Sequence, residues 1–328
     1  MRREARLLLV APCLSCLGVA FAASAASAEP EIFSPGVISG PAGEACPAFT
    51  PDGNTVYFDV GSMILVSHRA QGQWSKPQIA PFSGTWGDHD PSIAPDGSYI
   101  VYVSNHPFDN SGKALSATAH GQVYPNAGGN LWRVDRKGND WGTPMHLPAT
   151  VNDSDRTYAP SIAADGSLYY IHPDAAGTFH VYRSAYKNGN YQTAEQLVLG
   201  DPTAQVHDPA IAPDQSFIVF NWNDAKKPGM GGLYIAFREG NHWSQPIDLG
   251  VAVNGKDGRW NQWGAHLSPD HRTLYYTSDR TTPTSYPRTP EQAQRQLARM
   301  QQWDNGGDNI WSVSLAPWLH AHHATDDR

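Results

Sequence analysis

Residues 90–105, DPSIAPDGSYIVYVSN, contain an apolar segment, a Pro-Asp-Gly turn and a second segment rich in Tyr, Val and Ile. Proline presets φ for a turn, aspartate bonds its own backbone and glycine accepts positive φ, whereas β-branched and aromatic residues favour strands. The stretch therefore predicts two antiparallel strands joined by a tight turn. Related stretches recur at four other places: 46–59 CPAFTPDGNTVYFD, 159–172 APSIAADGSLYYIH, 208–222 DPAIAPDQSFIVFNW and 264–279 GAHLSPDHRTLYYTSD.

Each copy is followed by the pattern of a third strand, for example 130–135 NLWRVD. All copies but the last are also followed by the pattern of a fourth strand, for example 242–249 HWSQPIDL. A repeated unit of four antiparallel strands is typical of a propeller blade. The last copy ends at its third strand, whereas residues 31–39, EIFSPGVIS, have the fourth-strand pattern. We therefore predict an all-β fold, a single closed β-propeller of five four-stranded blades, in which the N-terminal strand completes the last blade.

The Pro-Ser-x-x-Pro-Asp-Gly unit at 91–97 and Ser278-Asp279-Arg280 resemble the TolB-like, WD-like β-propeller repeat of exported proteins. The resemblance covers about residues 31–315. It implies the propeller fold and favours a binding module of the cell envelope. It implies no particular partner, because the separate N-terminal domain and the six blades of TolB are not expected here.

The N-terminus has the pattern of a secretory signal. Three arginines, Arg2, Arg3 and Arg6, precede an apolar stretch at 7–23, and Ala26-Ser27-Ala28 fits a cleavage site. We expect a signal peptide at 1–28, the propeller at 29–318, a disordered tail at 319–328 and a periplasmic or secreted protein. An uncleaved membrane anchor is the alternative. No later stretch is long and apolar enough to span a membrane.

Only one of the three cysteines, Cys46, lies outside the predicted signal. An intrachain disulfide is therefore not expected, and Cys46 is either a small buried residue or a reactive or metal-binding thiol. The formal net charge of −8 disfavours a nucleic-acid partner, because such binding needs a basic surface. A glycan or a periplasmic or cell-envelope protein is the expected partner of a monomeric chain.

Two insertions, at about 105–129 and 281–308, fall in loops between second and third strands and should crowd one face of the propeller. The second contains Thr289 followed by Pro290, an N-cap and first-turn pair that predicts a short helix at the rim. Functional residues concentrate on loops held by a rigid scaffold. The ligand site is therefore expected on this face.

The loops of that face contain aromatic, carboxylate, amide and arginine side chains, which suit sugar rings and their hydroxyl and carboxylate groups. Two alternatives remain: the tryptophans fill gaps between the blades, or the arginines pair with neighbouring aspartates. The predicted ligand-binding residues are Glu44, Trp86, Asp88, Arg156, Tyr158, Trp222, Arg259, Trp260, Gln262 and Arg280.

His89-Asp90 and His207-Asp208 occupy equivalent positions in two copies of the repeat. One interpretation is structural, with each aspartate bonding the backbone of the neighbouring blade. The other is a site for a divalent transition metal at the mouth of the channel, because imidazole and carboxylate suit Zn, Mn or Fe. Its predicted ligands are His89, His207, His172 and His266.

Two functions follow from these patterns. The first is an exported TolB-like binding module whose axial face holds a glycan, a cell-wall fragment or a protein partner. The alternative is a carbohydrate-active enzyme, a polysaccharide lyase or glycoside hydrolase, with or without metal assistance. No motif identifies a catalytic residue.

Overall fold

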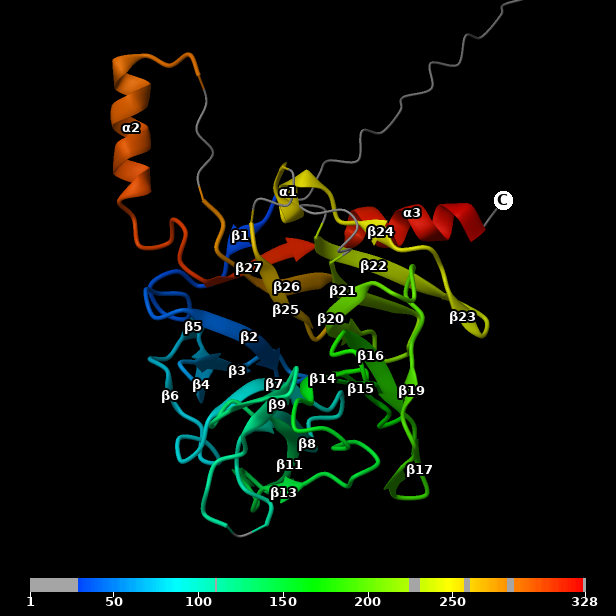
Figure 1. Ribbon diagram of the computed structural model, residues 1–328. Helices are drawn as coiled ribbons and strands as arrows, with labels where there is room; N and C mark the ends of the chain where they lie inside the picture. The colour runs from blue at the N-terminus through cyan, green and yellow to red at the C-terminus, as the bar shows by residue number, and fades with distance from the viewer. Residues whose placement is uncertain (1–28, 110, 224–230, 257–259, 282–285, 327–328) are drawn as a thin grey trace, which may run out of the picture.

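The computed structural model describes residues 29–109, 111–223, 231–256, 260–281 and 286–326. These residues form five antiparallel sheets arranged in a ring, in chain order from sheet one to sheet five (Figure 1). The predicted all-β, five-bladed propeller is confirmed. The predicted signal peptide at 1–28 and Arg259 lie outside the described residues.

Three long strands form the inner part of each sheet, and the two strands nearest the axis are joined by the turns of the repeat. These strands are, from sheet one to sheet five: β2 (Glu44–Phe49), β3 (Thr55–Val60), β4 (Met63–Ala70); β7 (Asp88–Ile93), β8 (Tyr99–Ser104), β11 (Asn130–Lys137); β14 (Tyr158–Ile162), β15 (Leu168–Pro173), β16 (Phe179–Ser184); β20 (Gln205–Ile211), β21 (Phe217–Asn223), β22 (Gly232–Glu239); β25 (Gln262–Leu267), β26 (Thr273–Ser278), β27 (Asn309–Ser314).

The fourth strand of most sheets is divided into short pieces. In sheet one, for example, Pro77 precedes the second piece, and proline cannot donate to a strand ladder. Two further hairpins lie outside this pattern. The edge pieces are β5 (Gln73–Trp74), β6 (Gln78–Ile79), β12 (Asp140–Trp141), β13 (Met145–His146), β19 (Glu195–Gln196), β23 (His242–Trp243) and β24 (Ile247–Asp248); the hairpins are β9 (Ala117–Ala119) with β10 (Gln122–Tyr124) and β17 (Tyr186–Lys187) with β18 (Asn190–Tyr191).

The N-terminal strand closes the ring. Strand β1 (Glu31–Ile32) pairs antiparallel with β27, with Glu31 opposite Ser312 and Ile32 opposite Trp311. The blue β1 accordingly lies beside the red β27 in Figure 1. Sheet five is therefore built from both ends of the propeller, as the fourth-strand pattern at 31–39 predicts, and the outer edge of β27 is covered.

The hydrophobic core consists of five clusters, each between two consecutive sheets. Between sheets five and one, for example, Val56 and Phe58 pack with Ile310, and all three are fully buried. Both faces of every sheet are thus covered, which explains why the second strands are almost continuously apolar.

The described residues also form three helices: α1 (Val251–Asn254), α2 (Pro290–Met300) and α3 (Ala316–Asp326). The rim helix α2 begins at the predicted N-cap Thr289, and none of its residues is buried. Figure 1 shows it standing apart from the sheets. Within the described residues, no helix combines the length and apolar character needed to cross a membrane.

The segment from residue 319, for which the sequence led us to expect a disordered tail, lies in helix α3 up to Asp326. Trp318 and Leu319 pack against the cluster between sheets four and five, and the ring of His322 stacks on Phe237 with centroids 3.9 Å apart. Apolar residues in the first turn of α3 therefore attach the segment to the propeller.

Candidate functional site

One residue of each inner strand has a left-handed backbone, at the point where a β-bulge shifts the strand register. In four of the five sheets the next residue is proline, which cannot continue the ladder. All five residues line one small axial cavity of about 10 Å³. We call them the axial ring: Cys46 (φ 50°), Asp90 (φ 49°), Ala159 (φ 51°), Asp208 (φ 49°) and Gly264 (φ 59°).

Side chains of the axial ring connect neighbouring sheets. The thiol of Cys46 donates a hydrogen bond to Oδ1 of Asp90 at 3.1 Å. The backbone N–H of Ala159 donates to Oδ2 of Asp90 at 3.2 Å, and that of Gly264 donates to Oδ2 of Asp208 at 3.1 Å. Both aspartates thus bond the backbone of the next sheet, which is the structural role proposed for them from the sequence.

The ionisable groups near the axis have unusual proton affinities. Burial opposes charge on His89 and Asp90, but their contact at 3.3 Å outweighs it, raising the pKa of His89 to about 8 and lowering that of Asp90. Burial, and then the charge of Asp90, raises the pKa of Asp59 and raises that of Asp208 to about 7. Burial lowers the pKa of His266 to about 4. Near neutral pH, an ion pair therefore lies beside acids that hold their protons unusually strongly.

Four rings form a continuous row at one mouth of the channel, across sheets two, three and four. Centroid distances are 6.0 Å from His89 to Tyr158, 6.1 Å from Tyr158 to Phe179 and 5.4 Å from Phe179 to His207. We call these four residues the aromatic row. The guanidinium carbon of Arg156 lies 5.4 Å from the Phe179 centroid, and its buried Nε has no hydrogen-bond partner among the residues that the structure describes.

The aromatic row lies on the face predicted from the loops. First and third strands of a sheet start on the same side of the ring, because neighbouring strands are antiparallel. Tyr158 is the first residue of β14 and Phe179 the first residue of β16, whereas His89 and His207 lie near the starts of β7 and β20. The hydroxyl of Tyr158 donates to the carbonyl of Ala127 in the first insertion at 3.1 Å.

Three of the predicted ligand residues are buried and engaged in local structure. Glu44 is 6% exposed and accepts a hydrogen bond from the backbone N–H of Gly40 at 2.7 Å. Asp88 is 3% exposed and accepts from the hydroxyls of Ser83 and Ser104. Gln262 is 2% exposed and donates to a backbone carbonyl. These side chains hold loops and strand ends in place.

Arg280 lies between two indole rings. Its guanidinium carbon is 4.5 Å from the ring centroid of Trp260 and 4.6 Å from that of Trp311, and it donates to the hydroxyl of Tyr276 at 3.3 Å. Much of its planar surface is thus covered by protein. Trp260, Arg280 and Trp311 lie in or next to strands of sheet five, so this contact does not fill a gap between two blades.

Trp86 and Trp222 also contact rings of the protein. Trp86 stacks on His106 with centroids 5.1 Å apart, and Trp222 meets Tyr234 edge-on at 5.0 Å. Both tryptophans are half-buried, and the indole nitrogen of Trp222 is buried without a partner. They flank the mouth and are not part of the aromatic row.

The four histidines predicted as metal ligands have different environments. His89 contacts Asp90, His207 lies in the aromatic row, and His266 lines the axial cavity. His172 stacks on a tyrosine at 3.7 Å and has its Nε2 atom 3.8 Å from a carboxylate oxygen of Asp153. Within the described residues, the group of three metal-ligating side chains that lie within 4.8 Å of one another contains none of these histidines.

Two residues near the axis were not among those predicted. Phe179 follows the loop between the second and third strands of sheet three. Its contacts with Tyr158 and His207 depend on how the sheets are arranged in the ring, so the sequence alone does not reveal them. Asp59 had a visible signal: it is the one acid at its position in the repeat, where the other copies have Val103, His172, Asn221 and Thr277.

The ring of sheets and its axial residues define a β-propeller protein. Neither a family model nor a curated protein matches the chain. Its structure is similar to a TolB candidate from Agrobacterium tumefaciens (15% identity over 83% of this chain and 90% of that chain, TM-score 0.47). It is also similar to an α-L-arabinofuranosidase from Lactobacillus brevis (12%, 81% and 89%, 0.46) and a thermostable family-43 glycoside hydrolase (11%, 83% and 88%, 0.50). At these identities the likeness describes the fold.

Proposed function

We propose that this protein binds an anionic carbohydrate at the channel mouth. The observation that carries the proposal is the aromatic row with Arg156 above Phe179. Aromatic faces suit the C–H faces of sugar rings, and a guanidinium binds a carboxylate through two parallel hydrogen bonds. The buried, unpartnered Nε of Arg156 is a donor for such a ligand.

The charges around the mouth favour a sugar with isolated carboxylates over a nucleic acid. The whole chain has a formal net charge of −8, whereas the Arg156 guanidinium places a local positive charge over Phe179. An acidic protein repels a dense polyanion at long range, but a local cation can still bind one carboxylate.

Calorimetric titration with a uronic-acid oligosaccharide and its neutral counterpart tests this proposal. Arg156→Gln should weaken binding of the uronic-acid ligand by about tenfold or more, because a charged hydrogen bond contributes about 1.5–3 kcal/mol. The neutral ligand should be affected much less. Phe179→Ala should weaken both, because both sugars present C–H faces.

Arg238→Gln is the matched control, because Arg238 also lies over an aromatic ring, 5.1 Å from the centroid of Trp243 in edge strand β23. It should bind as the parent does. The proposal is wrong if the parent binds neither oligosaccharide, or if Arg156→Gln and Arg238→Gln bind the uronic-acid ligand with the same affinity as the parent.

Hydrolysis of a glycoside is the second candidate function. Asp90 and Asp208 line the same axial cavity, and glycoside hydrolysis generally uses a pair of acidic residues. At about 10 Å³ the cavity has room for one water molecule, so the sugar would have to lie at its mouth. Incubation with polysaccharides followed by a reducing-end assay tests it. Asp208→Asn should abolish any release of reducing ends while preserving binding. Activity that survives this substitution would rule out the paired-carboxylate mechanism.

We also propose that the protein is exported and acts as a monomer in the periplasm or outside the cell. The support is the signal pattern at 1–28 with Ala26-Ser27-Ala28 before Glu29. Cell fractionation and the mass of the purified protein test this. A protein that stays in the cytoplasm with residues 1–28 attached would contradict it.

A further inference from the structure

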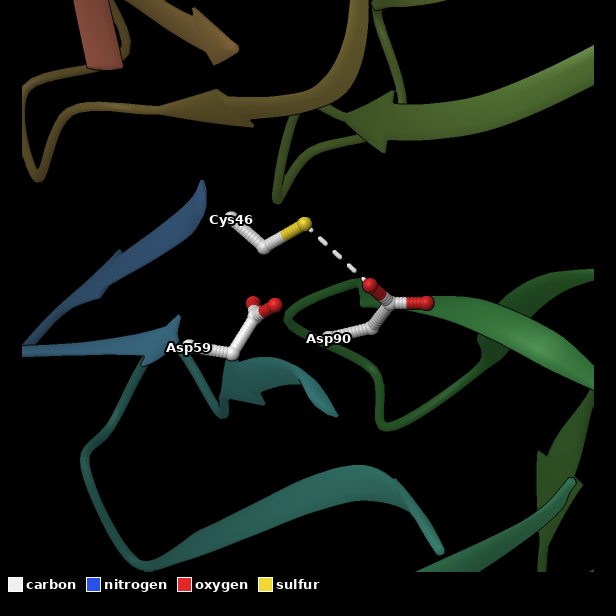
Figure 2. Close-up of side chains that lie close together, drawn as sticks. All are labelled: Cys46, Asp59 and Asp90. Atoms are coloured by element: carbon white, nitrogen blue, oxygen red, sulfur yellow. Dashed lines mark hydrogen bonds between the residues drawn. The ribbon is translucent and has the colours of Figure 1, made fainter. Parts of the chain in front are cut away.

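Three side chains with metal-binding atoms meet beside the axis. One ligand atom each of Cys46, Asp59 and Asp90 lie within 4.8 Å of one another, and the Cys46 Sγ atom is 3.1 Å from Oδ1 of Asp90. Figure 2 shows the thiol and the Asp59 carboxylate on the same side of Asp90, converging from different strands. Cys46 and Asp90 belong to the axial ring, and Asp59 lies near the end of β3.

The Asp59 carboxylate supplies an independent observation. Asp59 is only 7% exposed, and its buried Oδ1 atom has no hydrogen-bond partner in the part of the chain that the structure describes. A buried polar atom without a partner is costly, and a buried carboxylate is normally paired with a cation or coordinates a metal. The position next to a second carboxylate and a thiol, both acceptors once deprotonated, therefore suits a bound cation.

We propose that Cys46, Asp59 and Asp90 bind one Zn²⁺ ion. Zinc accepts cysteine sulfur, carboxylate oxygen and histidine nitrogen in four-coordinate sites, whereas Ca²⁺ and Mg²⁺ prefer oxygen alone. Water would take the fourth position of the tetrahedron. On binding, the Cys46 thiol and any protonated Asp59 carboxyl release their protons to solvent, and one sulfur–zinc bond and two oxygen–zinc bonds form, with no oxidation or reduction.

Gly264 leaves the space that the thiol needs. A Cβ atom at this position would lie 2.7 Å from Sγ of Cys46. The thiol thus lies where a side chain at position 264 of sheet five would otherwise be. Because the three ligands come from β2, β3 and β7, zinc would join sheets one and two at the axis. This proposal does not depend on carbohydrate binding.

Cobalt(II), titrated into tag-free, chelator-treated protein, is the probe. A cobalt–thiolate bond gives a charge-transfer band in the near ultraviolet, so the native protein should develop that band and saturate at one ion per chain. Zinc should then displace cobalt and remove the band. Cys46→Ser keeps the size of the side chain and should abolish the band. Asp59→Asn keeps the shape and should weaken binding about tenfold or more.

Asp88→Asn is the matched control, because Asp88 is buried to a similar extent in β7 but accepts hydrogen bonds from two serine hydroxyls. It should bind cobalt as the native protein does. Two results overturn the proposal: the native protein saturates with no sulfur band, or Cys46→Ser and Asp59→Asn bind with unchanged affinity. The second result would assign the ion to exposed groups such as His320 of α3. The band of the native protein decides the question even if one variant does not fold.

Discussion

The sulfur of Cys46 occupies the space next to Gly264, since a Cβ atom on Gly264 would lie 2.7 Å from Sγ. Gly264 also has a φ of 59°. It is thus the one member of the axial ring at which both the backbone conformation and a side-chain contact favour glycine. The contact joins sheet five to sheet one, next to the point where the ring closes.

Gly264→Ala should therefore destabilise the protein by about 2–4 kcal/mol, about 1 kcal/mol from the positive φ and the rest from displacement of the thiol. Urea unfolding measures this change. Gly240→Ala is the control, because Gly240 has a φ of 60° but no atom within 4 Å of a Cβ atom. It should lose only about 1 kcal/mol. Equal losses in the two variants would show that the thiol contact is unimportant.

Removal of residues 31–39 should prevent cooperative folding, because this segment provides β1 and part of the cluster between sheets five and one. Size-exclusion chromatography should show aggregation through the uncovered edge of β27. A truncated protein that stays monomeric and melts like the parent would contradict the role assigned to closure.

A milder pair of variants tests the same closure. Ile38→Ala should cost about 2–4 kcal/mol, because Ile38 is 2% exposed and belongs to that cluster. Val37→Ala should cost no more than about 0.5 kcal/mol, since the neighbouring Val37 is 42% exposed. Chemical unfolding at one pH compares them.

The fold could be predicted because its signals are local and repeated. Each Pro-Asp-Gly turn with its flanking strands specifies a hairpin, and the fourth-strand pattern at 31–39 predicts that this segment joins the last sheet, where Ile32 pairs with Trp311. The C-terminal segment carries no such local signal. The contacts of Trp318 and Leu319 with the core depend on how sheets four and five pack, which no local pattern contains.

Arg156 and Tyr158 were named as ligand residues from the sequence, but the contacts that bring them together with Phe179 could not be predicted. Glu44 and Asp88 have suitable chemistry for a ligand, yet short local hydrogen bonds to Gly40 and Ser104 use their oxygens. The left-handed bulge that turns Cys46 and Asp90 toward one another is a backbone feature, so their contact could not be inferred from spacing. The position of Phe179 next to Tyr158 and His207 depends on how the sheets curve around the ring.

Loss of the N-cap of α2 should unfold that helix without affecting the propeller. The Thr289 hydroxyl accepts from the backbone N–H of Gln292, and Gln292 Oε1 accepts from that of Thr289. Thr289→Ala should cost the helix about 1 kcal/mol. Because α2 buries no residue, the midpoint of thermal unfolding should not change. Hydrogen exchange of the amides at 290–300 should accelerate.

Gln302→Ala, beyond the end of the helix, is the control and should leave exchange in α2 unchanged. A fall in the thermal midpoint of Thr289→Ala similar to that expected for a core variant would show that α2 stabilises the propeller. Helix α2 would then contact the sheets, although none of its residues is buried in this structure.

The stability of the protein should fall in mild acid because His207 is buried as a neutral ring. Burial, and then the nearby His180, lowers the pKa of His207 to about 4, whereas an unfolded histidine has a pKa of about 6.5. Below about pH 6.5 the unfolded state takes up a proton that the folded state refuses, so the stabilisation is complete above this pH and is lost as pH falls toward 4. Between about pH 7.5 and about pH 5 the loss from this residue is about 2 kcal/mol.

Urea unfolding of the parent and of His207→Gln at those two pH values measures the effect. The variant should show a smaller loss on acidification, by about 2 kcal/mol, because glutamine does not titrate. His242→Gln is the control, since the His242 side chain is 73% exposed and its loss should leave the pH dependence as in the parent. An unchanged pH dependence in His207→Gln would mean that the ring in the aromatic row is protonated as readily in the folded protein as in the unfolded chain.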